Sequence, residues 1–306
     1  ADLPGISART SVDVNTRPLD RNTLRTQTGR QCLPDAYFAV SDWGDDRAFS
    51  VQIDEARAAA YDDRDQTDEV AIATLAKRFL YFGFGQEALH TLALDNVQSQ
   101  ERRYLTAIAR LMEGDRVQAN DFEGQISCDA PVALWAMLAL DGGPSDAVIE
   151  RNAILIAFKA LPGPVRDVVA PRLAQAFVQV GDIDASRQIL ARLQSSASNL
   201  SDAALAESAF AEAVDDNAGA IDALETVLDD SARATPDLLR EYFEIGIREG
   251  RNFTDEEFAL ADALRFEVAG SPDALALTVA QLRAQIAVGQ FSPARALLDQ
   301  VAPILE

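Results

Sequence analysis

The residues that could bind a cofactor begin at a pair of glycines. The segment Gly83-Phe84-Gly85-Gln86-Glu87-Ala88 matches GxGxxA, the phosphate-binding turn of dinucleotide-binding folds. That chemistry needs a β-strand before the turn, so that the pyrophosphate meets the N-terminus of the next helix. Residues 71–82 instead carry apolar side chains at helical spacing. We therefore interpret the glycines as a turn between two helices, and we expect no cofactor.

Metal and catalytic chemistry have little support. An EF-hand-like start at Asp63, Asp65 and Thr67 lacks the glycine and the glutamate that later positions of such a loop require. His90 is the only histidine, which leaves no two-histidine zinc site. We therefore expect no metal, and the sequence has no nucleophile elbow or Ser-His-Asp arrangement. One enzymatic alternative stays open, a pair of carboxylates acting on a glycan from a helical toroid, because the chain has 49 acidic residues.

Net charge and hydropathy exclude two classes of function. The formal net charge of −22 would repel a phosphate backbone, so we expect no binding to nucleic acid. No run of about 18 apolar residues occurs, so we expect no membrane span. The acidity is consistent either with simple solubility or with a basic partner.

The cysteines and the first residues bear on localisation. A disulfide between Cys32 and Cys128 would close a loop of about 96 residues, worth roughly 4 to 5 kcal/mol in the chain-entropy model, and would persist only in an oxidising compartment. Two buried free thiols are the other option. The opening Ala1-Asp2-Leu3 fits the product of signal-peptide cleavage as well as a trimmed sequence. Arginine far outnumbers lysine, which is typical of a GC-rich bacterial genome. We expect a bacterial, periplasmic or otherwise exported protein, with a cytoplasmic one as the alternative.

The elements that must position any site are helices. Residues 1–50 lack helical periodicity and are predicted to form an irregular N-terminal arm. Residues 51–306 are predicted to form one domain of helical hairpins, with a division into 51–142 and 143–306 as an option. We expect about 14 helices. Their predicted starts include Thr254 with Glu257, Thr235-Pro236 and Ser271-Pro272. Their predicted ends are Gly83, Gly114, Gly181, Gly250 and Gly289.

Two of these hairpins share one residue pattern. The first has Ile72, Leu75, Ala76, Phe79, Gly83, Ala88 and Leu92. The second repeats it about 98 residues later, close to three repeat lengths of 34, with Ala170, Leu173, Ala174, Phe177, Gly181, Ser186 and Leu190. Small residues at such positions let two helices approach closely, and large ones fill the gaps. The pattern resembles a divergent tetratricopeptide repeat.

This resemblance implies a fold and a function. The implied fold is an all-α, right-handed α-solenoid of stacked antiparallel helix hairpins. The implied function is that of a non-enzymatic scaffold or adaptor that binds a protein or peptide in its groove. A further alternative is the soluble segment of a larger envelope assembly for secretion or motility. The family's groove-facing positions, carried onto the two hairpins, are Lys77, Leu80, Tyr81, Gln175, Val178 and Gln179. Only Lys77 matches the family's carboxylate clamp, so we do not expect capture of a C-terminal carboxylate.

Overall fold

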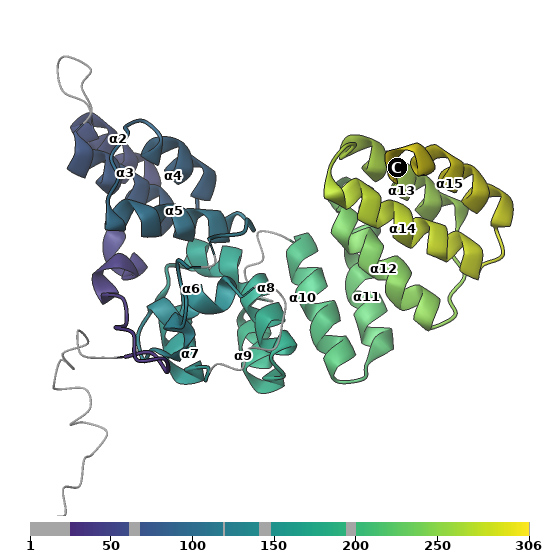
Figure 1. Ribbon diagram of the computed structural model, residues 1–306, viewed down its shortest axis with the longest axis horizontal. Helices are drawn as coiled ribbons and strands as arrows, with labels where there is room; N and C mark the ends of the chain where they lie inside the picture. Colours follow the sequence, from purple (N-terminus) through teal and green to yellow (C-terminus); the bar gives the residue numbers. More distant parts are fainter. Residues whose placement is uncertain (1–24, 61–67, 119, 141–147, 194–199, 306) are drawn as a thin grey trace, which may run out of the picture. The chain divides into compact units, whose positions relative to one another are not determined.

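The computed structural model describes residues 25–60, 68–118, 120–140, 148–193 and 200–305, with side chains up to residue 300. Within these residues it has fourteen α-helices that pack in neighbouring pairs, and no sheet. The predicted all-α class is confirmed (Figure 1). In the same residues no helix has the length and apolar character needed to cross a bilayer. The EF-hand-like segment at Asp63 lies outside the described residues.

The chain divides into two compact units, with the boundary inside helix α8 between Arg166 and Asp167. Unit 1 contains the 3-10 helices η2 (Asp35–Tyr37), η3 (Val40–Trp43) and η4 (Gln125–Ser127), and the helices α2 (Phe49–Ala60), α3 (Glu69–Tyr81), α4 (Gly85–Leu92), α5 (Gln100–Met112), α6 (Val132–Leu138) and α7 (Arg151–Ala160). Unit 2 contains most of α8 (Gly163–Gln179), then α9 (Ile183–Leu193), α10 (Leu200–Ala213), α11 (Asn217–Leu228), η5 (Ser231–Arg233), α12 (Pro236–Arg248), α13 (Asp255–Glu267), α14 (Pro272–Ala287) and α15 (Phe291–Leu305).

Side-chain caps fix where several helices begin. The Thr254 hydroxyl accepts a hydrogen bond from the Glu257 backbone N–H at 3.2 Å, and the Glu257 carboxylate accepts one from the Thr254 backbone N–H at 2.6 Å. This is the predicted capping box at the start of α13. Thr235 and Ser271 likewise cap α12 and α14, each before a proline in the first turn. The predicted starts of these three helices are confirmed.

One turn geometry ends six helices in the described residues. At each turn a residue with positive φ donates its N–H to the carbonyl three residues before it. The following N–H bonds to the carbonyl five residues before it, which is a Schellman motif. The residues with positive φ are Gly83, Gly114, Gly181, Asp215, Gly250 and Gly289. The last four are spaced 34, 35 and 39 residues apart, so unit 2 has a hairpin period close to the predicted one.

The small residues of the two matched hairpins are fully buried. Ala76 on α3, Ala88 on α4, Ala174 on α8 and Ser186 on α9 each have 0% exposed surface. The large residues of the pattern on α3 and α8, including Phe79 and Phe177, are buried too. The apolar face of each helix is therefore used in packing, as the spacing predicts.

The described part of the predicted arm, residues 25–48, is fastened to the body of unit 1. A disulfide joins Cys32 to Cys128, 96 residues later in the sequence, with the two Cα atoms 6.0 Å apart. The Leu33 backbone N–H also donates to the side-chain oxygen of Gln125 at 2.8 Å. The disulfide and this bond hold the arm against the segment that precedes α6.

Candidate partner-binding groove

The three residues predicted on the first hairpin are engaged by the chain itself. The Lys77 ammonium pairs with Glu101 at 2.5 Å and lies 5.9 Å from the centre of the Trp43 ring. The Tyr81 hydroxyl donates to the backbone carbonyl of Asp45 at 3.3 Å. Leu80 has 0% exposed surface. Leu80 is therefore a core residue whose side chain cannot line a groove, which corrects its predicted place.

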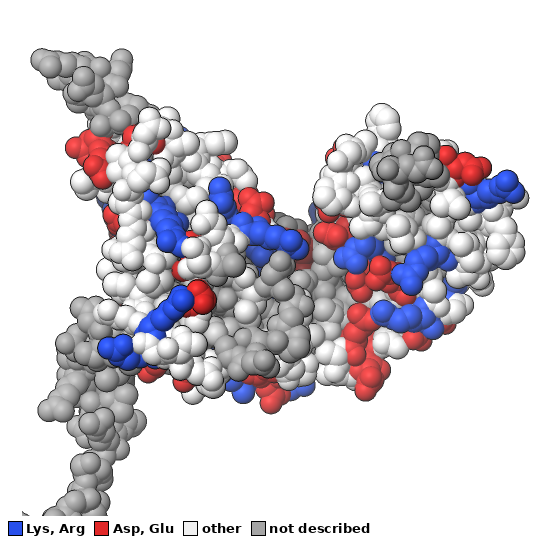
Figure 2. Space-filling model, in the orientation of Figure 1, with Lys and Arg blue, Asp and Glu red and all other residues white. Residues whose placement is uncertain are grey.

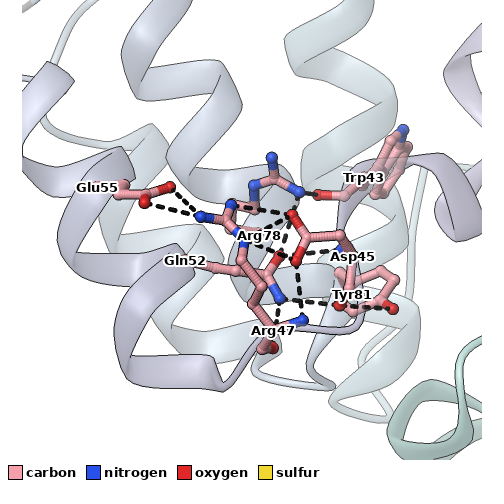
Figure 3. A network of polar contacts seen from close by, with 7 residues as sticks. All are labelled: Trp43, Asp45, Arg47, Gln52, Glu55, Arg78 and Tyr81. Atoms are coloured by element: carbon pink, nitrogen blue, oxygen red, sulfur yellow. Dashed lines mark hydrogen bonds and ion pairs between the residues drawn. The ribbon is translucent and has the colours of Figure 1, made fainter.

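A network of polar contacts holds this part of the arm on α2 and α3 (Figure 3). The buried Gln52 side chain donates to the backbone carbonyls of Asp45 and Arg47, at 2.9 and 2.7 Å. Its amide oxygen accepts from the Asp45 N–H at 3.0 Å. From α3, the Arg78 guanidinium donates to the Trp43 carbonyl at 2.5 Å. Gln52 and Arg78 therefore bind the arm through its backbone.

Ion pairs complete the network on its exposed side. The Arg47 guanidinium lies between the carboxylates of Asp45 and Glu55, with nitrogen–oxygen distances of 2.9 and 2.7 Å. Hydrogen bonds from Arg47 lower the pKa of the Asp45 carboxyl, and the two carboxylates raise the pKa of Arg47. The segment from Trp43 to Arg47 thus contacts the face of α3 that the repeat pattern assigns to a partner.

The three residues predicted on the second hairpin are brought together in unit 2. Gln175, Val178 and Gln179 on α8 line a cavity of about 310 Å³. Its remaining lining residues are Leu205 and Ala209 on α10 and Asp237, Arg240 and Glu241 on α12. We call these eight residues the α8–α12 groove. Sequence reasoning missed the five residues on α10 and α12, because their hairpins match the repeat pattern only in their amphipathic period.

The charges in the groove favour a cationic ligand. Arg240 is its only basic side chain and lies 3.5 Å from Asp237 and 3.7 Å from Glu241. A third carboxylate, Glu244, lies 3.7 Å from Arg240. Burial raises the pKa of the Glu241 carboxyl, Arg240 lowers it, and Glu212 adds to the rise. A positive charge entering here would relieve the Glu241 carboxylate of part of the cost of its burial.

The rest of the groove is suited to an extended chain. The side-chain amides of Gln175 and Gln179 offer donors and acceptors for a peptide backbone. Val178, Leu205 and Ala209 offer apolar surface between these amides and the charged residues of α12. On the face of unit 2 drawn in Figure 2, acidic and basic side chains lie next to one another.

His90 and the polar groups at a second cavity in unit 2 contact solvent or one another. His90 is exposed on α4, and no group of three or more His, Cys, Asp or Glu side chains in the described residues could hold a metal ion. A second cavity in unit 2, of about 330 Å³, is lined by α11, α12 and α13. There the Tyr242 hydroxyl donates to Glu257 and Arg251 pairs with Glu225, so these polar groups satisfy one another.

Comparison with known proteins adds no relative. No family model matches this chain. No curated protein and no solved structure matches it either. The residues of the groove are therefore the basis for inferring a function.

Proposed function

We propose that this chain is a non-enzymatic, tetratricopeptide-like scaffold that binds an extended segment of a partner protein in the α8–α12 groove. One observation carries the proposal. Gln175, Val178 and Gln179, which the repeat pattern alone selects, line one cavity with residues of α10 and α12. In a repeat architecture such a surface is the usual place of recognition, because stacked hairpins bury their other faces against one another.

The period of unit 2 supports the tetratricopeptide-like part of the proposal. Turns of one geometry at Gly181, Asp215, Gly250 and Gly289 separate the helices of four successive hairpins. Their spacing of 34 to 39 residues is close to the 34 of the tetratricopeptide unit. The buried small residues of α8 and α9 fit the same unit.

The charges of the groove define the chemistry of the partner segment. We infer a basic segment, with lysine or arginine side chains that pair with Asp237 and Glu241, and a backbone that bonds to Gln175 and Gln179. Pairing a cation with the half-buried Glu241 is worth more than an exposed pair, since part of the desolvation cost is already present in the free protein.

The disulfide supports an oxidising compartment, and we propose that the protein is exported. A cysteine pair 96 residues apart persists as a disulfide where thiols are not kept reduced. A proteomic comparison of periplasmic and cytoplasmic fractions tests the proposed export. Recovery of the protein only in the cytoplasmic fraction would overturn this proposal.

A double variant tests the groove. In Gln175→Ala with Gln179→Ala, a partner captured by the wild-type chain should be lost or bind at least about tenfold more weakly, because two sets of backbone hydrogen bonds are removed. Gln188→Ala, at an exposed position on α9, is the matched control and should bind as the wild type does. Equal binding by the double variant and the control would remove the groove assignment.

A glycan-acting enzyme is the second candidate, on the single observation that burial raises the pKa of Glu241 beside Asp237. A general acid in a glycosidase has such a pKa. Hydrolysis of a glycan panel by the wild type, lost in Glu241→Gln, would favour the enzyme over the scaffold.

A further inference from the structure

The outer side of α14 in unit 2 is apolar, although it faces solvent. Leu275, Val279 and Ile286 are 39%, 46% and 48% exposed, and Leu282 on the same side is partly buried. After its first turn the helix has one charged residue, Arg283. A helix side that faces water is normally polar, and exposed apolar surface marks sites of interaction. We call Leu275, Val279, Leu282 and Ile286 the α14 seam.

The opposite side of α14 holds the helix in place. It packs on α12, α13 and α15 (Figure 1), and Leu277, Ala280 and Ala284 on this side are at most 1% exposed. The helix is therefore formed before any partner binds, so a partner need not supply the cost of ordering it. No residue of α14 lines the α8–α12 groove, and the inference below does not depend on the proposed function.

The spacing of the α14 seam is that of a coiled coil. Its residues are four, three and four positions apart, so they occupy positions d, a, d and a of two successive heptads. Apolar residues that repeat every 3.5 positions keep one seam turned toward a second helix along the whole length of the contact. The outer side of α14 therefore fits another helix with the same spacing.

The residue types in the seam select the number and direction of the helices. The a positions hold the β-branched Val279 and Ile286, and both d positions hold leucine. In coiled coils this combination favours two parallel strands, whereas isoleucine at both positions, or leucine at a with isoleucine at d, favours three or four. In a two-fold parallel pair each seam residue meets the same residue of the other helix, so the α14 seam is complementary to itself.

The charges of α14 also permit a second copy. Two chains with a formal net charge of −22 repel each other, so they associate most readily where neither presents a carboxylate. The seam contains none. Arg283 flanks it at an e position, which in a parallel pair lies beside a g position of the other helix, here the neutral Thr278. No like charges meet along the pair.

The exposed apolar area sets the expected strength. Phe266 in the last turn of α13 is 86% exposed, and Phe291 at the start of α15 is 67% exposed, so aromatic residues adjoin both ends of α14 in the sequence. At about 200 Å² for a large side chain, these two and the three exposed seam residues amount to roughly 600 Å² per copy. A standard specific interface buries about 800 Å² per partner. The area therefore suits a reversible association.

We propose that the outer side of α14 is the interface of a parallel homodimer, in which the α14 seam packs against the same seam of a second copy of this chain. Val279 and Ile286 face their own counterparts, as do the two leucines, and the exposed apolar side chains become buried.

Sedimentation velocity of the full chain across the micromolar range tests the association. The mean mass should rise with concentration from one chain toward two. Val279→Glu places a carboxylate from each copy in the seam and should raise the dissociation constant at least about tenfold. Val70→Glu, at a 74% exposed position on α3 in unit 1, makes the same chemical change and should associate as the wild type does.

Cross-linking tests the direction of the pair. In a parallel pair the two copies of Leu275→Cys lie opposite each other, so mild oxidation should join two chains. In an antiparallel pair position 275 would face position 286, about 16 Å away along the helix axis from its own counterpart. Leu94→Cys, an exposed leucine in unit 1, is the control and should stay unlinked. Cys32 and Cys128 are bonded to each other, so no other thiol competes.

Several outcomes would overturn the proposal. The mass of one chain at every concentration would do so, and would leave the outer side of α14 to a helix of another protein. A mass that approaches three chains, or association of Val279→Glu equal to that of the wild type, would also contradict it. Linkage of Leu275→Cys only when it is mixed with Ile286→Cys would rule out the parallel arrangement. Circular dichroism checks that each variant is folded, and the cross-linking tests the interface without a charge in the seam.

Discussion

The Tyr81 ring occupies the space in which a side chain at position 44 would lie. A Cβ added to Gly44 would overlap the ring atoms of Tyr81, although the backbone of Gly44 is extended and suits any residue. Glycine is required here by space and not by backbone conformation. The close approach lets the arm contact α3 and lets the backbone carbonyl of Asp45 accept a hydrogen bond from the Tyr81 hydroxyl.

Gly44→Ala should therefore loosen the arm. The methyl group forces the Tyr81 ring aside and breaks its hydrogen bond, which we expect to cost about 1 to 3 kcal/mol. Hydrogen exchange of residues 40–48 and thermal unfolding measure the effect. Gly163→Ala is the control, since a Cβ there meets nothing within 4 Å. Equal protection of the arm in both variants would contradict the space argument.

Ser186→Ala should stabilise the second matched hairpin. The Ser186 hydroxyl is buried without a hydrogen-bond partner among the described residues. Alanine removes this hydroxyl and keeps a small side chain at the position. We expect a gain of about 1 kcal/mol in the free energy of unfolding, measured by urea denaturation. The reciprocal change, Ala88→Ser in the first hairpin, should cost a similar amount. A loss of stability in Ser186→Ala would show that the hydroxyl has a partner in solution.

Asp215→Gly should raise stability as well. Asp215 is the only non-glycine residue with positive φ in the described part of the chain, at 61°. Glycine adopts this conformation without strain, so we expect up to about 1 kcal/mol, seen as a higher melting temperature. Gly181→Asp, at the same position of the preceding hairpin, should lower the melting temperature. A melting temperature that changes in the same direction in both variants would argue against backbone strain at Asp215.

The half-buried carboxyl of Glu241 should make stability depend on pH. The pKa of the Glu241 carboxyl in the folded state is raised above its unfolded value of 4.5, so the folded state binds the proton more tightly than the unfolded state does. The wild type therefore loses stability as the pH rises from 4.5 through the folded pKa. Glu241→Gln should therefore melt at a higher temperature at pH 7, by an amount that shrinks toward pH 4.5. Melting curves from pH 4.5 to 8 measure this difference. Glu267→Gln, at an exposed position, controls for net charge, and a gain independent of pH would contradict the prediction.

The sequence predicted the parts of the fold that depend on local geometry. Gly181 and Gly250 end helices because glycine tolerates positive φ, and Ala76 and Ala174 are buried because only small side chains fit between close helices. The turn at Asp215 was not predicted, since aspartate is common in solvated loops.

The site was predictable only where it follows the repeat. Gln175 and its neighbours on α8 follow from repeat position, but Arg240 and Glu241 come from a hairpin with a weaker match. The contact of the arm with Lys77 and Tyr81 depends on non-periodic residues, so no helical pattern reveals it.

The bond between Cys32 and Cys128 has a consequence for biosynthesis. During synthesis the first thiol leaves the ribosome long before the second, and the four helices α2 to α5 are made in between. The nascent chain therefore carries an unpaired, oxidisable sulfur through most of the assembly of unit 1. The bond can therefore close only after α5 has been made, and until then Cys32 is available to a thiol of another chain.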